Sequence, residues 1–215
     1  MRSALARIGV AAAAAALLTS CSGGDGGTKE PEGLAAAEAC GGFAKEEPVG
    51  AALKAVLGGD RFDDFYSKSD EALARLREDA AAPWADSYRP QRVTYCGLRL
   101  AEGGGQNSLK IEVAAVGKGP YLGPALAPKV TSYASGLEAF SSSGLGKLYF
   151  TCRMKPPALE IVVETAVWGP EDVPETDLER RTRLITLANA AARQVSAKLG
   201  CQGDKLATGV PAARS

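Results

Sequence analysis

The spacing of apolar residues changes along this chain, and that change limits the folds open to it. In residues 49–57 and 69–82 apolar side chains recur every three or four positions, which predicts two helices. From Val93 onward apolar and polar residues alternate, which predicts β-strands. Helical spacing returns after residue 176. Because both periods are present in one chain of this length, we expect a single α+β domain.

The alternating region divides into two predicted β-hairpins. The first joins 93–100 to 109–115, and the second joins 148–154 to 159–167. Each strand has one apolar and one polar face, so we expect an antiparallel sheet of two β-hairpins with helices packed on one face. The residues expected to face the helices are Thr94, Cys96, Leu98, Leu100, Leu109, Ile111, Val113, Ala115, Leu148, Phe150, Cys152, Met154, Leu159, Ile161, Val163 and Thr165.

Three further segments are predicted from their breaking residues and their composition. Residues 61–66 read as a short aromatic connector between the first two helices. Residues 117–128 contain three prolines and are expected to form a loop. The apolar residues at 130–133 predict a short strand at the edge of the sheet.

The last helix has the strongest start and stop signals. Thr176 and Glu179 have the spacing of a capping box, and Gly200 is typical of a helix end. We therefore place the folded domain at residues 34–201. The polar segment 202–215 is expected to be a disordered tail.

The N-terminal residues 1–20 have the composition of a signal peptide. Arg2 and Arg7 provide a positive start, and an apolar run extends from Ile8 to Leu18. That run is shorter than the about 20 residues that a membrane-spanning helix needs. We therefore expect cleavage and export of the rest of the chain.

The sequence Leu18-Thr19-Ser20-Cys21 resembles the lipobox of bacterial lipoproteins. In such proteins the cysteine thiol receives a diacylglyceryl group, cleavage makes that cysteine the first residue, and the acyl chains (palmitate among them) hold the protein on the membrane. We expect lipid on Cys21, with residues 21–33 forming the lipidated end and a flexible tether. The alternative is an ordinary secretory signal followed by an incidental cysteine.

Four cysteines remain after Cys21, namely Cys40, Cys96, Cys152 and Cys201. An even number in an exported chain predicts two disulfides. Cys96 and Cys152 fall on the strand faces that the helices should cover, while Cys40 and Cys201 flank the first and last helices. We favour the pairs Cys40–Cys96 and Cys152–Cys201, which would tie each terminal helical segment to the sheet. The pair Cys96–Cys152, leaving Cys40–Cys201, stays open.

The composition excludes several classes of chemistry. The chain has no histidine, which excludes Ser-His-Asp and Cys-His catalysis, zinc held by histidine and haem held by a proximal histidine. No serine-hydrolase motif, phosphate-binding loop or dinucleotide fingerprint occurs. The 25 basic and 25 acidic residues balance, so nothing in the charge predicts a nucleic-acid partner. We expect no catalytic residue, cofactor or metal.

Two kinds of residue remain as weaker candidates. The acidic pairs at 46–47, 63–64 and 171–172 are typical of a solvated surface rather than of paired catalytic carboxylates. Four aromatic residues are expected in loops or at element ends, where they form a binding surface or cap the edge of the core; we favour the second role. These are Trp84, Tyr88, Tyr121 and Trp168.

Several stretches together resemble small cell-envelope lipoproteins of actinobacteria. They are the lipobox ending at Cys21, Cys40-Gly41-Gly42, the sequence from Gly58 to Phe62, the sequence from Leu148 to Cys152, and the sequence from Ala197 to Cys201. The resemblance implies an envelope location and a fold held by disulfides. It carries over no catalytic residues, because none are defined for those proteins.

These observations predict a lipid-anchored protein on the extracytoplasmic face of the cell membrane. We expect a non-enzymatic binding or interaction module whose partner is an envelope protein or a small ligand. One alternative is an envelope hydrolase that uses carboxylates or a serine. Another is a small solute-binding receptor, although two-lobed receptors typically need a longer chain.

Overall fold

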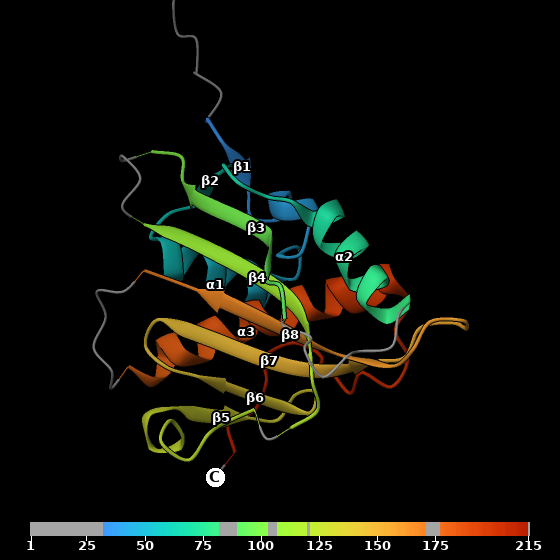
Figure 1. Cartoon of the computed structure of the whole chain (residues 1–215). Helices are drawn as coiled ribbons and strands as arrows, with labels where there is room; N and C mark the ends of the chain where they lie inside the picture. The colour runs from blue at the N-terminus through green and yellow to red at the C-terminus, as the bar shows by residue number, and fades with distance from the viewer. Residues whose placement is uncertain (1–31, 82–89, 103–106, 120, 171–176, 215) are drawn as a thin grey trace, which may run out of the picture. The chain divides into compact units, whose positions relative to one another are not determined.

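An eight-stranded antiparallel sheet is the main element of the unit formed by residues 31–215 (Figure 1). The computed structural model describes residues 32–81, 90–102, 107–119, 121–170 and 177–214. The strands lie in the order β1-β2-β3-β4-β8-β7-β6-β5. Their bounds are Leu34–Ala35 (β1), Arg61–Asp64 (β2), Val93–Leu100 (β3), Ser108–Val116 (β4), Thr131–Tyr133 (β5), Glu138–Ser141 (β6), Leu145–Cys152 (β7) and Ile161–Trp168 (β8).

The α+β class and both predicted hairpins, β3–β4 and β7–β8, are confirmed. The sheet is nevertheless larger than two hairpins, because β1, β2, β5 and β6 extend it on both sides. Strand β5 lies at an edge, as predicted, whereas β2 occupies the segment expected to be a connector. These additional strands have two to four residues each, which is too short for an alternating pattern to stand out.

Three helices contribute buried residues to one apolar core with the sheet, which confirms the prediction of a covered face. Helix α3 packs on β6, β7 and β8 and against α1, while α2 packs on β3 and β4. Figure 1 shows α1 and α3 behind the sheet. The bounds are Glu47–Leu57 (α1), Ser69–Ala81 (α2) and Leu178–Leu199 (α3), with 3-10 turns at Ala39–Gly41 (η1) and Ala127–Lys129 (η2).

The N-terminus of α3 corrects the predicted capping box. Asp177 is the N-cap, and its carboxylate accepts a hydrogen bond from the backbone N–H of Arg180 at 2.9 Å. An aspartate at this position satisfies one of the free N–H groups of the first turn. Thr176, the residue predicted to cap the helix, lies outside the described residues. The other end is as predicted, since Gly200 closes α3 with a left-handed backbone.

A β-bulge in β3 changes which residues face the helices. Thr94 lies opposite Glu112, but Cys96 lies opposite Ile111, so Tyr95 is an extra residue in this strand. As a result Tyr95 and Cys96 both enter the covered core, and Thr94 lies on the other face with Glu112. The prediction that Thr94 points inward is therefore wrong.

Most of the other residues predicted to face the helices do so. Leu159 is a second exception, because it precedes β8 and 43% of its surface is exposed. Leu100 and Met154 are partly buried against the core. The fully or almost fully buried members are Cys96, Leu98, Leu109, Ile111, Val113, Ala115, Leu148, Phe150, Cys152, Ile161, Val163 and Thr165.

The favoured disulfide pairing is also confirmed. Cys40, in η1, is bonded to Cys96 of β3, with their Cα atoms 5.6 Å apart. Cys152 of β7 is bonded to Cys201, which follows α3, with Cα atoms 4.7 Å apart. Each bridge therefore joins a helical segment to a central strand on the covered face.

Residues 202–214 differ from the disordered tail that the sequence predicts. The buried side chain of Asn189 in α3 donates from Nδ2 to the carbonyls of Ala207 and Gly209, at 2.9 and 3.1 Å. It also accepts a hydrogen bond from the hydroxyl of Ser135 at 2.7 Å. Closer to the C-terminus, backbone hydrogen bonds join the tail to the segment around β5. Such bonds need no apolar side chains, so composition alone did not reveal them.

The N-terminal predictions concern residues that the structure leaves undescribed. Cys21, the signal peptide over 1–20 and the tether over 21–33 fall there, apart from the last two tether residues. In the part of the chain that is described, no helix is both long and apolar enough to cross a membrane. Lipid attachment at Cys21 therefore stays a prediction.

Candidate functional site

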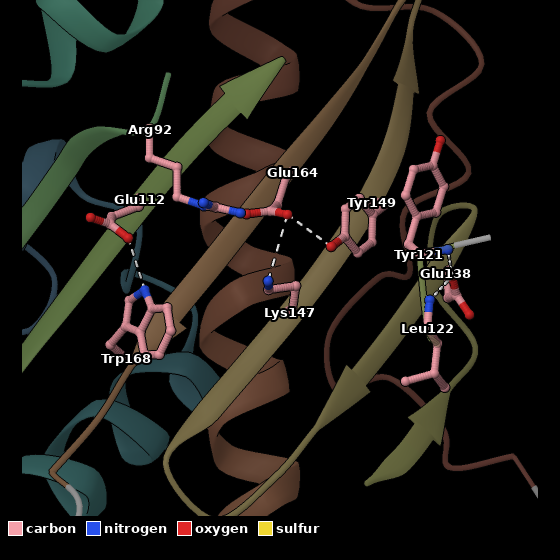
Figure 2. Close-up of polar contacts among 9 residues, drawn as sticks. All are labelled: Arg92, Glu112, Tyr121, Leu122, Glu138, Lys147, Tyr149, Glu164 and Trp168. Carbon is pink, nitrogen blue, oxygen red and sulfur yellow. Dashed lines mark hydrogen bonds and ion pairs between the residues drawn. The ribbon is translucent and has the colours of Figure 1, made fainter. Parts of the chain in front are cut away.

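The face of the sheet away from α1 and α3 carries small hydrogen-bonded groups of polar and aromatic side chains (Figure 2). Alternation along each strand sends these residues away from the core, because successive side chains point to opposite faces. We call this surface the open face. Its central members are Arg92, Glu112, Lys147, Tyr149, Glu164 and Trp168.

Glu164 of β8 is the centre of the set, and only 3% of its surface is exposed. Its Oε1 accepts a hydrogen bond from Nε of Arg92 at 2.8 Å, and its Oε2 accepts one from the hydroxyl of Tyr149 at 2.8 Å. The Nζ of Lys147 lies 3.6 Å from the same Oε2. A buried carboxylate is costly unless it is paired and hydrogen-bonded, and these two hydrogen bonds and two cationic side chains meet that requirement.

The register of the strands brings these groups together. Tyr149 of β7 lies directly opposite Glu164, and Lys147 is the next residue of β7 on the same face. Arg92 immediately precedes β3 and reaches Glu164 across β4. Opposite and diagonal neighbours on one face of a sheet are within side-chain reach. The network is therefore built on the most central strands of the sheet.

The contacts within this network determine the protonation states of Glu164, Arg92 and Tyr149. Burial alone would raise the pKa of Glu164, but the hydrogen bond from Arg92, the charge of Lys147 and the Tyr149 hydroxyl outweigh it and lower that pKa. The hydrogen bond to Glu164 raises the pKa of Arg92. Burial and the nearby Glu164 raise the pKa of Tyr149 far above its ordinary value. Glu164 therefore holds no proton to donate at neutral pH, and Tyr149 does not release its own.

Tyr149 also joins the network to an aromatic stack. Its ring lies against that of Tyr121 with centroids 4.1 Å apart and planes 11° from parallel. The Oε2 of Glu138 holds the loop in place by accepting the backbone N–H groups of Tyr121 and Leu122, at 3.0 and 3.1 Å. Beneath the loop is a second, smaller apolar cluster: Ala114, Val116, Phe140, Tyr149 and Val162. Tyr121 thus caps an apolar cluster, as favoured from the sequence.

Trp168 lies at the other side of the network, and 40% of its surface is exposed. Its indole Nε1 donates to Oε2 of Glu112 at 2.9 Å, and the other carboxylate oxygen of Glu112 is 2.9 Å from Nζ of Lys110. Trp168 was expected at an element end and is the last residue of β8. It combines an exposed aromatic surface with a fixed orientation, which is a common property of binding residues.

The other residues singled out in the sequence lie apart from this network. Both disulfides are on the covered face. Glu46 accepts two hydrogen bonds from Arg193, and Asp63 forms an ion pair with Arg99, so one carboxylate of each pair is bound by an arginine. The acidic pair at 171–172, together with Trp84 and Tyr88, lies outside the described residues.

Sequence reasoning missed the importance of Glu164, Arg92 and Lys147. It placed Glu160 and Glu164 alike on the polar side of one strand, yet Glu160 is exposed and Glu164 is buried. No local signal separates these two glutamates, because the partners of Glu164 come from other strands. As for metal ligands, the described ranges contain no group of three or more Cys, Asp or Glu side chains placed to hold an ion.

Comparison with known proteins adds no relative: no protein-family model, no curated protein and no solved structure matches this chain.

Proposed function

We propose that this protein is a lipid-anchored, non-enzymatic binding module on the extracytoplasmic face of the cell membrane, and that the open face is its binding surface. The observation that carries the proposal is the Glu164 network. It places paired charges on the open face, where the separate Trp168–Glu112 hydrogen bond adds an oriented indole. Fixed groups of this kind favour recognition, because little conformational freedom is lost when a partner binds.

The anchor rests on the sequence around Cys21. A positive start, a short apolar run and the sequence LTSC favour cleavage before Cys21 and lipid on its thiol. The Gly-rich segment 22–33 then separates the folded domain from the bilayer. The partner is an envelope protein or a small ligand that reaches the open face.

An envelope hydrolase is the alternative function. A carboxylate that serves as a general acid needs a raised pKa, whereas the partners of Glu164 lower its pKa. A small solute-binding receptor remains compatible with a binding surface of this kind. The open face therefore favours binding over proton-transfer chemistry.

The anchor is tested by intact-mass measurement of the protein extracted from membranes. We expect loss of residues 1–20 and a diacylglyceryl adduct on Cys21. The variant Cys21→Ser should leave the membrane fraction, because both acyl chains are lost together. Full membrane retention of that variant would contradict the proposal.

The binding surface is tested by site-specific photo-crosslinking in intact cells. A photoreactive amino acid replaces Trp168 on the open face in one variant and Ala55, an exposed residue of α1, in the control. We expect crosslinked products from position 168 and none from position 55. Equal yields at both positions, or products from position 55 alone, would overturn the assignment of the open face.

A further inference from the structure

A polar hollow adjoins the Tyr121–Tyr149 stack at one end of the open face. It has a volume of ≈ 360 Å³. A second hollow of ≈ 200 Å³ shares Lys118, Glu160 and Val162 with it, so the two hollows are neighbours. The side chains that define the chemistry of the larger hollow are Lys118, Tyr121, Glu138, Thr151, Glu160 and Arg214.

Tyr121 forms a fixed aromatic wall of this hollow. One side of its ring is stacked on Tyr149, and both it and the next residue are bonded through their backbone to Glu138. Figure 2 shows Tyr149 between Tyr121 and Glu164, so Tyr121 is on the outer side of the stack. A ligand that enters the hollow therefore meets an aromatic ring that is already in place, which lowers the entropic cost of binding.

The side chains that line the hollow carry charges of both signs. Lys118 and Arg214 are cationic, whereas Glu138 and Glu160 are anionic, and Glu160 is also paired with Arg153. A free anion would meet carboxylates, and a free cation would meet cationic groups. Thr151 adds a hydroxyl that both donates and accepts. The hollow thus offers both hydrogen-bond donors and acceptors, and its charges are not of one sign.

The tail of the chain helps to build this wall. The backbone N–H of Arg214 donates to the carbonyl of Ser132 in β5 at 2.8 Å, which fixes the end of the tail beside the sheet edge. Arg214 then lines the hollow opposite residues of β7 and β8. Part of the hollow therefore depends on the last described residue of the chain.

We infer that the hollow binds a neutral carbohydrate of two or more sugar rings. A sugar ring has an apolar C–H face, which packs against an aromatic ring, and hydroxyl groups around its rim, which both donate and accept. A wholly apolar ligand would remove charged groups from water without forming hydrogen bonds to them, which is unfavourable. The adjoining second hollow gives room for a further ring. This inference rests on the proposed binding function and names a ligand class for it.

The inference is tested by NMR titration of the full mature chain carrying Cys21→Ser, labelled with ¹⁵N. The probes are maltose, cellobiose and N,N′-diacetylchitobiose, with sodium phosphate and sodium glucuronate as charged comparators. We expect at least one disaccharide to shift the amides of Lys118, Tyr121, Glu138, Thr151 and Val162. Affinity in the millimolar range is sufficient, because each hollow is shallow and exposed.

Variants separate a binding role from a structural one. Tyr121→Ala should weaken disaccharide binding at least about tenfold, whereas Tyr121→Trp should retain it. Tyr66→Ala is the matched control, since Tyr66 is an exposed tyrosine that does not line the hollow. If Tyr121→Ala disturbs the fold, Glu160→Gln provides a second test, with weaker binding expected because a charged acceptor at the rim is lost.

Several results would overturn the inference. They are the absence of shifts with all three disaccharides, tighter binding of phosphate or glucuronate, or undiminished binding by both Tyr121→Ala and Glu160→Gln. Crosslinking at position 168 without sugar binding would reject the carbohydrate and leave the proposed function intact. Cleavage of a bound disaccharide, seen as new reducing-end signals, would confirm the ligand class but reject the non-enzymatic proposal.

Discussion

The two faces of the sheet are built from the same strands but are stabilised in different ways. On the covered face, Phe150 and its apolar neighbours are buried beneath α3 and the other helices. On the open face, the preceding residue Tyr149 is also buried, but it contacts Glu164 and Tyr121. Burial of apolar area stabilises the first face, whereas paired charges and stacked rings order the second.

The comparison shows that burial does not by itself identify a core. Phe150 is 0% exposed and Glu164 only 3%. Phe150 is covered by the helices, whereas Glu164 is covered by neighbouring side chains. The cover over Glu164 includes Arg92, whose side chain is 46% exposed. The open face therefore keeps its charges close to solvent, where a partner can reach them.

The largest effect is expected on the covered face. Phe150→Ala should lower the free energy of unfolding by about 3–5 kcal/mol, because it removes a fully buried ring and leaves a cavity. Urea unfolding at pH 7, followed by tryptophan fluorescence, measures the change. A loss below about 1 kcal/mol would mean that the helices do not pack tightly on this face.

Removal of the Cys152–Cys201 disulfide, which is also on the covered face, should lower the free energy of unfolding by a comparable amount. The double variant Cys152→Ala/Cys201→Ala should fold but lose about 2–5 kcal/mol, because the unfolded chain is no longer constrained. Cys201→Ala alone should give a lower yield of correctly oxidised protein, because Cys152 is then free to mispair. Peptide mapping without reduction checks the wild-type pairing, and a linked Cys96–Cys152 peptide would refute it.

On the open face, Glu164→Gln should cost about 2–3 kcal/mol at pH 7, since Arg92 and Lys147 lose their common anion. The folded-state pKa of Glu164 is lowered, so its contribution to stability is complete above the unfolded value of about 4.3. That contribution is lost as the pH falls through the lower, folded value. The stability difference between wild type and variant should therefore shrink below about pH 4.

Glu160→Gln is the matched control for that experiment. Glu160 forms an exposed ion pair with Arg153, and such pairs contribute less than about 1 kcal/mol. Urea unfolding across pH 3–7 compares the two variants. A pH-independent penalty for Glu164→Gln would show that its charge is not what orders the open face.

The smallest change in stability is expected for Trp168→Phe. This variant removes the hydrogen bond to Glu112 at an exposed position and should cost less than about 1 kcal/mol. The same substitution should reduce partner capture by a photoreactive residue placed at Lys110, which lies directly opposite Trp168. An unchanged crosslinking yield would remove Trp168 from the binding surface.

The sequence was sufficient for the features that depend on local pattern. Alternation placed Leu109, Ile111 and Phe150 in the core, and Gly200 marked the end of α3. The faces of the strands and the order of the helices also favoured the observed disulfide pairs, but left the Cys96–Cys152 alternative open. Strand faces and helix ends are set by the few residues around each position.

What the sequence did not predict depends on distant partners. The extra residue Tyr95 is defined only by the register of β3 against β4. Glu164 is buried because Arg92, 72 residues away in the chain, reaches it across the sheet. Asn189 orders the tail through carbonyls that no side-chain pattern reveals. In each case the deciding contact forms only when the strands and helices have assembled.

The two disulfides have a consequence for the way the chain is made. Cys40 and Cys96 are 56 residues apart, Cys152 and Cys201 are 49 apart, and the two loops follow one another without interleaving. If the chain is exported from its N-terminus and the thiol of Cys21 carries lipid, the other four thiols emerge in that order, so the first bridge can close before Cys152 emerges. An oxidant that joins each cysteine to the next one to appear produces the native pairs directly. We therefore expect correct oxidation without help from a disulfide isomerase.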